Sequence, residues 1–378
     1  MEHFITEIKI NELRHLSNIV ISLNPEKRQH LLLTGKNGSG KTSLLLALQE
    51  YLKAINSGVL ADLFDSSWMD QYRDSIEILF SEYKTLDALY KQGSFVTAYF
   101  PANRKMQILS ANGVEAVRLS NSYTIDSEPG ELLQKYLVHL KTQQSYARNE
   151  GDMDTVNRIQ KWFERFVYAL QILLEDTSIT LEYDYKEYDF KIHENGRKSF
   201  RFNELSDGYS SVIHIVSDLI LRMDGNWLLK DTLSEYDAEG IVLIDELETH
   251  LHIELQKKIL PFLTEFFPRI QFIVTTHSPY ILNSISNAKA YDLENCTELE
   301  GMYLYSADAL AEGYFDADEY SDALKMRIER YQYLVGRTEL DEEERIERAK
   351  LRVQLKGIPR GLSQEARDKF EEIEGKRL

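Results

Sequence analysis

The first part of the chain alternates between apolar and polar positions in short segments. Residues 5–10 (ITEIKI) and 18–23 (NIVISL) alternate, and residues 30–34 (HLLLT) form an apolar run that ends at a glycine-rich segment. Alternation predicts strands, and a short apolar run predicts a strand buried on both faces. Residues 43–55 (SLLLALQEYLKAI) then have helical spacing. The chain therefore begins with strands that lead into a glycine-rich loop and a helix.

The second half alternates predicted helices with predicted buried strands. Residues 209–223 (YSSVIHIVSDLILRM) and 251–267 (LHIELQKKILPFLTEFF) have helical spacing. Residues 240–246 (GIVLIDE) and 269–278 (RIQFIVTTHS) are apolar runs that end in polar residues. Alternating helices and buried strands are typical of a parallel sheet with helices on its faces. We therefore predict an α/β fold with a mostly parallel sheet and antiparallel N-terminal strands.

Long, charged helical segments separate these two parts. Residues 130–152 and 154–176 have helical spacing. Between the loop helix and these segments, residues 93–105 (GSFVTAYFPANRK) predict a strand that returns the chain briefly to the sheet. Residues 178–202 predict a strand pair that turns at Glu194, Asn195 and Gly196.

These patterns divide the chain into four parts. We expect an α/β part with the glycine-rich loop at residues 1–57, a mainly helical insertion at 58–177, a second α/β part at 178–290, and an acidic, mainly helical tail at 291–378.

Composition narrows the class of protein. No apolar run approaches the roughly 20 residues of a membrane-spanning helix, and the N-terminus lacks a secretion-signal pattern. The single cysteine, Cys296, suits a reducing compartment. We therefore expect a cytoplasmic protein without a membrane partner. The net charge of −18 opposes broad contact with nucleic-acid phosphates and favours a protein or small-ligand partner.

The glycine-rich segment fits the phosphate-loop pattern G-x-x-x-x-G-K-[ST]. In this pattern backbone N–H groups converge on phosphates at a helix N-terminus. Lys41 is expected to reach the β and γ phosphates of ATP, and the Thr42 hydroxyl to bind Mg²⁺. The predicted ATP-binding residues are Gly35, Lys36, Asn37, Gly38, Ser39, Gly40, Lys41, Thr42 and Ser43.

Polar residues also follow both apolar strands of the second half. Asp245 and Glu246 end one strand, which suits Asp245 to hold Mg²⁺ and Glu246 to act as general base on the attacking water. His277 ends the next strand, where it is placed to contact the γ phosphate or the water. We predict Glu246 and His277 as catalytic residues.

A short Leu-Ser-Asp-Gly segment precedes the helix at residue 209. Its backbone N–H groups and the Ser206 hydroxyl are able to form an anion site at a helix N-terminus. The alternative is a serine that caps the helix within a turn.

Together, the segments GKNGSGKTS, ELSDGYSS, IVLIDELETHLH and IVTTHSPYIL resemble those of ABC-type ATPases of the RecF, SMC and OLD group. The resemblance covers residues 1 to about 57 and about 198 to 290. It implies a homodimer or higher homo-oligomer in which ATP lies between protomers, with Ser206 and Gly208 of one protomer contacting the nucleotide of the other.

The chain departs from the family pattern at two places. Asp207 stands where transporter-type cassettes have glycine, and no glutamine loop is evident. The segment FPANRK occupies the place of that loop. Either Asn103 or Arg104 contacts Mg²⁺, water or phosphate there, or the segment is a surface loop.

The helical insertion and tail resemble those of ATPase subunits in bacterial antiphage systems of the Septu or PARIS kind. That resemblance implies a nucleotide-driven sensor or scaffold that controls a separately encoded effector, a nuclease or toxin. Two alternatives stay open: a RecF-like repair ATPase that clamps DNA when it binds ATP, and an interaction scaffold without nucleotide chemistry. Intact Lys41, Thr42, Asp245 and Glu246 oppose the latter.

Overall fold

A six-stranded sheet, here called sheet B, organises the first part of the computed structural model, which describes residues 2–57, 75–104, 108–225, 238–315, 322–358 and 364–375. All neighbouring strands of sheet B are parallel except the pair β10 and β11. This arrangement confirms the predicted α/β class with a mostly parallel sheet. In spatial order the strands are β11 (Thr297–Leu299), β10 (Ala288–Asp292), β3 (His30–Thr34), β9 (Ile270–Thr275), β8 (Glu239–Ile244) and β5 (Phe95–Phe100).

The N-terminal strands form a separate antiparallel sheet, here called sheet A. It contains β1 (Ile5–Leu13), β2 (Leu16–Ser22) and β4 (Ile76–Phe80), with β1 in the centre. The antiparallel N-terminal strands were predicted, but the sequence pattern did not single out β4 as their third member.

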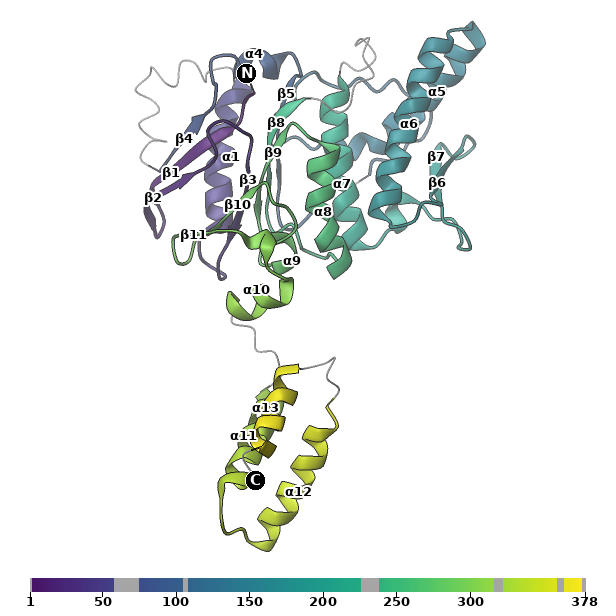
Figure 1. The fold of residues 1–378 in the computed structure, drawn as a ribbon. Coiled ribbons are helices and arrows are strands. Elements are labelled where there is room, and N and C mark those ends of the chain that lie inside the picture. Colours follow the sequence, from purple (N-terminus) through teal and green to yellow (C-terminus); the bar gives the residue numbers. More distant parts are fainter. Residues whose placement is uncertain are drawn as a thin grey trace. The chain divides into compact units, whose positions relative to one another are not determined.

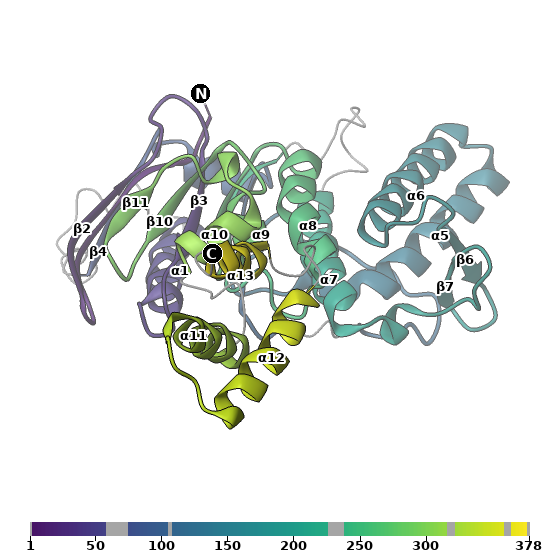
Figure 2. The ribbon, with the colours of Figure 1, turned by 60° about the horizontal axis from the view of Figure 1, so that its bottom comes forward.

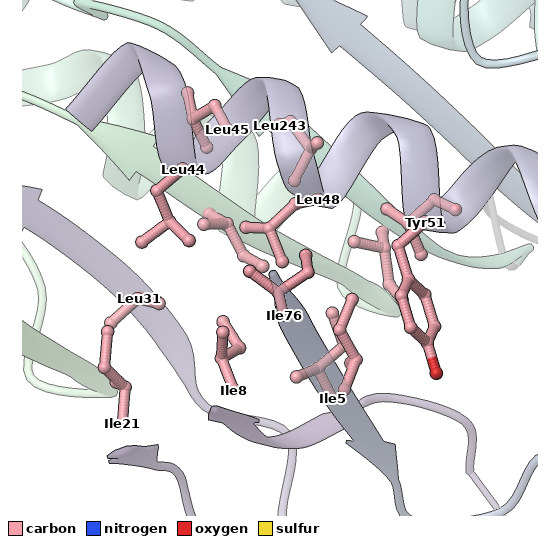
Figure 3. Close-up of a cluster of buried hydrophobic side chains, with 14 of the residues drawn as sticks. Ile5, Ile8, Ile21, Leu31, Leu44, Leu45, Leu48, Tyr51, Ile76 and Leu243 are labelled. Atoms are coloured by element: carbon pink, nitrogen blue, oxygen red, sulfur yellow. The ribbon is translucent and has the colours of Figure 1, made fainter. Parts of the chain in front are cut away.

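Helix α1 (Lys41–Ser57) joins the two sheets through one hydrophobic core. Leu44 and Leu48 of α1 are buried with Ile8 of β1, Ile76 of β4 and Leu243 of β8, as Figure 3 shows. Burying side chains of this size stabilises the fold by roughly 1.5–3 kcal/mol each. Because α1 packs against both sheets, the position of the loop that precedes it is fixed.

Sheet B presents alternate residues to its two faces, as expected for strands. Leu243 and Ile273 belong to the core with α1, and their neighbours Val242 and Phe272 are buried on the other face. That face is covered by α7 (Asp207–Met223) and α8 (Ile253–Phe266), whereas α1 lies on the opposite side (Figures 1 and 2). The short helices α4 (Leu86–Lys91) and α9 (Pro279–Leu282) follow β4 and β9.

A helical pair lies beside α7. The pair consists of α5 (Leu133–Glu150), which follows the 3-10 turn Pro129–Leu132, and α6 (Met153–Leu173). Trp162 of α6 stacks on Phe166 and donates a 2.6 Å hydrogen bond to buried Asp224 at the end of α7. No helix in the described ranges is both long and apolar enough to span a membrane.

The strand pair after α6 is present, but its turn was predicted at the wrong place. Strands β6 (Thr180–Asp184) and β7 (Asp189–His193) are joined at residues 185–188, where Asp184 accepts the backbone N–H of Lys186 at 3.1 Å. The predicted turn at residues 194–196 is a second turn, after which Phe200 forms a single bridge with Ile192. An aspartate cap thus replaces the glycine that hairpin turns usually contain.

The chain divides into two compact units, Met1–Leu304 and Tyr305–Leu378. The first unit ends with the 3-10 turn Met302–Leu304. Its sheet B includes β10 and β11 and therefore continues past residue 291, where the acidic tail was predicted to begin. The predicted domain limits otherwise stay predictions. The second unit contains α10 (Ala307–Gly313), α11 (Asp322–Gly336), α12 (Glu342–Lys356) and α13 (Gln364–Gly375), and the last three enclose a small core around Tyr331, Leu355 and Phe370.

Buried His30 at the start of β3 is expected to make stability fall in mild acid. Its Nδ1 accepts the Phe272 N–H at 3.1 Å, and burial, helped by nearby Arg28, lowers the pKa of His30 from 6.5 to about 4. Below pH 6.5 the unfolded chain takes up a proton that the folded chain refuses, so the free energy of unfolding decreases as the pH falls. Linkage gives a loss of about 2 kcal/mol at pH 5.

Urea unfolding of the wild type and of His30→Asn at pH 7 and pH 5 measures this loss. Asparagine keeps a hydrogen-bond acceptor but does not titrate, so the wild type is expected to lose about 2 kcal/mol more than the variant over this range. Equal losses in both proteins would show that His30 is not the responsible group.

Candidate nucleotide-binding site

The predicted phosphate loop connects β3 to α1 and depends on glycine at both of its ends. Gly35 and Gly40 have φ angles of +127° and +96°, which side chains rarely tolerate. A Cβ on Gly35 would lie 2.9 Å from the Ser39 hydroxyl, and one on Gly40 would lie 2.8 Å from the Leu16 side chain. The loop therefore closes tightly on the Ser39 side chain at one end and against Leu16 of sheet A at the other.

Lys41 opens α1 and folds back over the loop. Its ammonium donates to the carbonyl oxygens of Gly35 at 2.7 Å and Lys36 at 3.1 Å. Burial lowers the pKa of Lys41, while Glu246 and Asp245 act in the opposite direction. The cation is thus held over the loop, where the phosphates of a nucleotide are expected to bind.

Thr42 and Asp245 meet although 203 residues separate them. The Thr42 hydroxyl donates to Asp245 Oδ2 at 2.9 Å, and the Thr275 hydroxyl donates to Oδ1 at 2.6 Å. Thr275 in turn accepts the backbone N–H of Glu246 at 2.7 Å. The two predicted magnesium ligands, Thr42 and Asp245, therefore lie together at the edge of sheet B where β3, β9 and β8 end, Thr42 at the start of α1 and Asp245 after β8.

The donor set of this pair fits Mg²⁺. A hydroxyl and a carboxylate are hard oxygen ligands, and Mg²⁺ in nucleotide sites is usually held by one or two protein oxygens with phosphates and waters completing its shell. Within the described ranges, no group of three or more histidine, cysteine or acidic residues is arranged to hold a metal. A magnesium ion would consequently depend on the nucleotide for the rest of its ligands.

Glu246 leaves the end of β8 in a strained conformation. Its φ angle is +45°, in the left-handed region that non-glycine residues seldom adopt. Its Oε2 accepts a 3.3 Å hydrogen bond from the Thr249 hydroxyl. The side chain lines a cavity of about 210 Å³ together with Lys41, Thr42 and Asn37. The strained turn thus brings the predicted general base to the phosphate loop.

His277 follows β9 and presents an unused ring nitrogen. Its backbone N–H donates to Glu248 Oε1, while its buried Nε2 has no hydrogen-bond partner among the described residues. Burial and the charge of Lys41 lower the pKa of His277, so its ring is neutral at pH 7. An orphaned buried nitrogen fits a group that contacts a ligand, because such atoms are normally paired.

The predicted signature residues lie outside this cavity. Ser206 is exposed at the N-terminal cap of α7, and its side chain makes no capping hydrogen bond. Gly208 is buried, and a Cβ there would lie 2.5 Å from the carbonyl oxygen of His250. Gly208 therefore has a packing role within its own chain, whereas the Ser206 hydroxyl remains available.

Two basic residues of the cavity were not predicted. Arg14 and His15 form the tight turn between β1 and β2 and line the cavity beside the phosphate loop. Their sequence signal is weak, since basic residues at a hairpin tip are common, and only the packing of Leu16 against Gly40 brings the tip here.

The surface-loop alternative for the segment FPANRK holds for Asn103 but not for Arg104. Asn103 is exposed, but Arg104 is 4% exposed and donates to the carbonyl oxygens of Asp245 at 2.5 Å and Glu246 at 3.0 Å. Arg104 is therefore not a surface residue, and its donors are bound to backbone carbonyls and to the Ser211 hydroxyl. A contact of Asn103 with Mg²⁺, water or phosphate stays a prediction.

Comparison with known proteins places the chain in a family. A family model described as "AAA domain, putative AbiEii toxin, Type IV TA system" matches residues 70–283, more than half of the chain. The chain belongs to this family. The matched range of the AAA domain includes Arg104, the signature segment, both strand-end acids and His277.

Curated relatives agree with this assignment. The chain is 26% identical over 313 residues to Septu protein PtuA of Bacillus mycoides (strain KBAB4), covering 78% of this chain and 41% of the relative. It is 38% identical over 92 residues to the retron Ec83 probable ATPase of Escherichia coli, covering 24% and 17%. The AAA-domain chain thus spans less than half the length of either relative. The predicted kinship with ATPases of the Septu kind is confirmed.

Among solved structures, an Smc head bound to the C-winged helix domain of ScpA matches with a TM-score of 0.40 and 15% identity. The match covers 76% of this chain and 94% of that one. This likeness is too low to carry an argument about function.

Gly208→Ala is expected to destabilise the AAA-domain chain even without nucleotide. The added methyl group meets the backbone of His250 and forces a shift, which lowers the free energy of unfolding by about 1–3 kcal/mol. Gly113→Ala is the matched control because a Cβ at Gly113 meets open space. Denaturant unfolding compares the two variants. If they unfold at the same denaturant concentration, the contact with His250 does not constrain position 208.

Proposed function

We propose that the protein binds and hydrolyses ATP with Mg²⁺ at the site formed by the phosphate loop and the ends of β8 and β9. The observation that carries this proposal is the 2.9 Å hydrogen bond between Thr42 and Asp245, which joins the loop to the acid pair beside Lys41. The similarity to a protein named as a probable ATPase supports it.

Each residue has a distinct task in the proposed reaction. Backbone N–H groups of the loop and the Lys41 ammonium bind the β and γ phosphates. Thr42 and Asp245 would hold Mg²⁺, and a bound Mg²⁺ would neutralise charge on the phosphate oxygens. Glu246 orients the attacking water and accepts its proton, and the free Nε2 of His277 contacts the γ phosphate or that water. Closure around the nucleotide excludes bulk water from the reacting atoms.

The site requires a second protomer. The cavity of about 210 Å³ is bounded by the loop, the β1–β2 turn and Glu246, and it is open to solvent on the remaining side. We propose that Ser206 and Gly208 of a partner protomer close that side in a homodimer or higher homo-oligomer. The exposed, uncapped Ser206 hydroxyl supports this arrangement.

The proposed biological role is control of a separate effector. Kinship with Septu PtuA and retron ATPases supports a cytoplasmic, nucleotide-driven sensor or scaffold that restrains or licenses a nuclease or toxin in antiphage defence. The net charge of −18 favours such a protein partner over duplex DNA, which the RecF-like alternative requires.

Glu246→Gln is expected to abolish phosphate release while preserving ATP binding. Loss of a general base lowers the rate by roughly 100-fold to 10,000-fold. Because the variant no longer hydrolyses the ATP that holds two protomers together, ATP and Mg²⁺ should convert it to a larger assembly. A measurement of its mass in solution detects this change. Lys41→Ala should lose both nucleotide binding and assembly, and Glu254→Gln on the exposed surface of α8 should behave like the wild type.

Two results would contradict this scheme. Unchanged phosphate release by Glu246→Gln would show that Glu246 is not the general base. A solution mass that stays the same with and without ATP, in the wild type and in Glu246→Gln, would show that nucleotide does not drive assembly. ATP-dependent binding of duplex DNA that weakens steeply with salt would favour the DNA-clamping alternative.

A further inference from the structure

Arg104 is buried between the acid pair and α7 with all its donors used. A guanidinium carries five N–H donors. Nε donates to the Ser211 hydroxyl at 2.9 Å. The two terminal nitrogens donate to the carbonyl oxygens of Pro101 at 3.0 Å, Asp245 at 2.5 Å, Glu246 at 3.0 Å and Leu247 at 3.4 Å. Burial lowers the pKa of Arg104 to about 10, so it remains charged at neutral pH.

These acceptors are the backbone of the turn that aims Glu246. The carbonyls of Asp245, Glu246 and Leu247 follow one another through the position where φ of Glu246 is +45°. A strained conformation persists only where its surroundings determine it. The hydrogen bonds of three consecutive carbonyls to one planar guanidinium hold the Glu246 turn in this conformation. A lysine has a single ammonium and lacks the fork geometry.

The same side chain reaches the first turns of α7. Ser211 lies one helical turn after Gly208 and close to the exposed Ser206 cap. Two more contacts join this end of α7 to the site. Gly208 packs against the His250 carbonyl, and the ring of His214 meets Phe100 edge-on with centroids 5.8 Å apart. The end of α7 and the acid-pair turn therefore form one connected body.

We propose that Arg104 is a positioning residue that couples the Ser206 end of α7 to the orientation of Glu246. This inference rests on the proposed ATPase function. When a second protomer's nucleotide engages the α7 N-terminus, Arg104 transmits the resulting position of α7 to the carbonyls on which the Glu246 turn is built. Hydrolysis is thereby tied to assembly, because only in an assembled pair does a second protomer's nucleotide fix the position of α7.

Arg104→Lys tests the coupling because it keeps the charge and removes the fork. The phosphate loop and Lys41 are untouched, so the KM for ATP should stay near the wild-type value. Misplacement of Glu246 should lower kcat roughly 100-fold. Steady-state phosphate release over a range of ATP concentrations separates the two constants, and solution mass with ATP and Mg²⁺ reports assembly.

Arg222→Lys is the matched control. Arg222 is also buried on α7 and donates to the carbonyl oxygens of Thr97 at 2.9 Å and Thr124 at 3.0 Å, but it does not touch the acid pair. It should lower the melting temperature without changing kcat once folded. Equal losses of kcat in Arg104→Lys and Arg222→Lys would reduce Arg104 to a structural role and overturn the proposal.

Ser211→Ala keeps the test decisive if Arg104→Lys does not fold. It removes the link to α7 and leaves the carbonyl contacts of Arg104 in place, so kcat should fall by about tenfold with KM unchanged. Wild-type kcat in Ser211→Ala would overturn the coupling. Absence of phosphate release by the wild type would instead overturn the ATPase proposal itself, which distinguishes the two failures.

Discussion

The buried carboxylate of Asp245 at the end of β8 needs hydrogen-bond donors, and the architecture of the site depends on the two hydroxyl groups that supply them. Asp245 is 3% exposed and receives one hydroxyl from the phosphate-loop helix and one from β9. Both donors reach it because β3, β9 and β8 are parallel neighbours that end at the same edge. An unpaired charge at this depth would cost several kcal/mol, so strand order, loop and acid are constrained together.

Around that carboxylate the site balances charge within a small space. Lys41 and Arg104 are both buried near Asp245, Glu246 and Glu248, and the acids oppose the effect of burial on the two cations. The two cations nevertheless serve different surfaces. Lys41 faces the loop, whereas Arg104 holds the backbone behind the acids. The phosphates of a nucleotide would bring further negative charge to the loop side. Lys41 could then exchange its hydrogen bonds to the carbonyls of Gly35 and Lys36 for bonds to phosphate oxygens.

Local patterns predicted the parallel strands, the loop helix and the phosphate-loop segment that lines the cavity, because each of these depends on short-range periodicity or on one contiguous motif. What they did not predict depends on distant segments. The buried contacts of Arg104 are invisible in FPANRK, since arginine at a strand end is usually solvated, whereas Arg104 is enclosed by α7 and the residues 245–247 turn. Arg14 and His15 enter the site through the fit of Leu16 against Gly40. The turn that joins β6 and β7 lies at residues 185–188 and uses an aspartate cap, whereas the predicted turn lay at residues 194–196.

The close approach of Gly208 to the His250 carbonyl links two segments that are separated by more than 40 residues in the chain. The helix start and the residues 246–252 turn must change in concert, because neither has room to vary alone. Anyone building chimaeras from cassettes of this kind should treat them as a single interchangeable module. A signature segment transplanted without its matching turn would bring a foreign backbone into a space that fits one hydrogen atom.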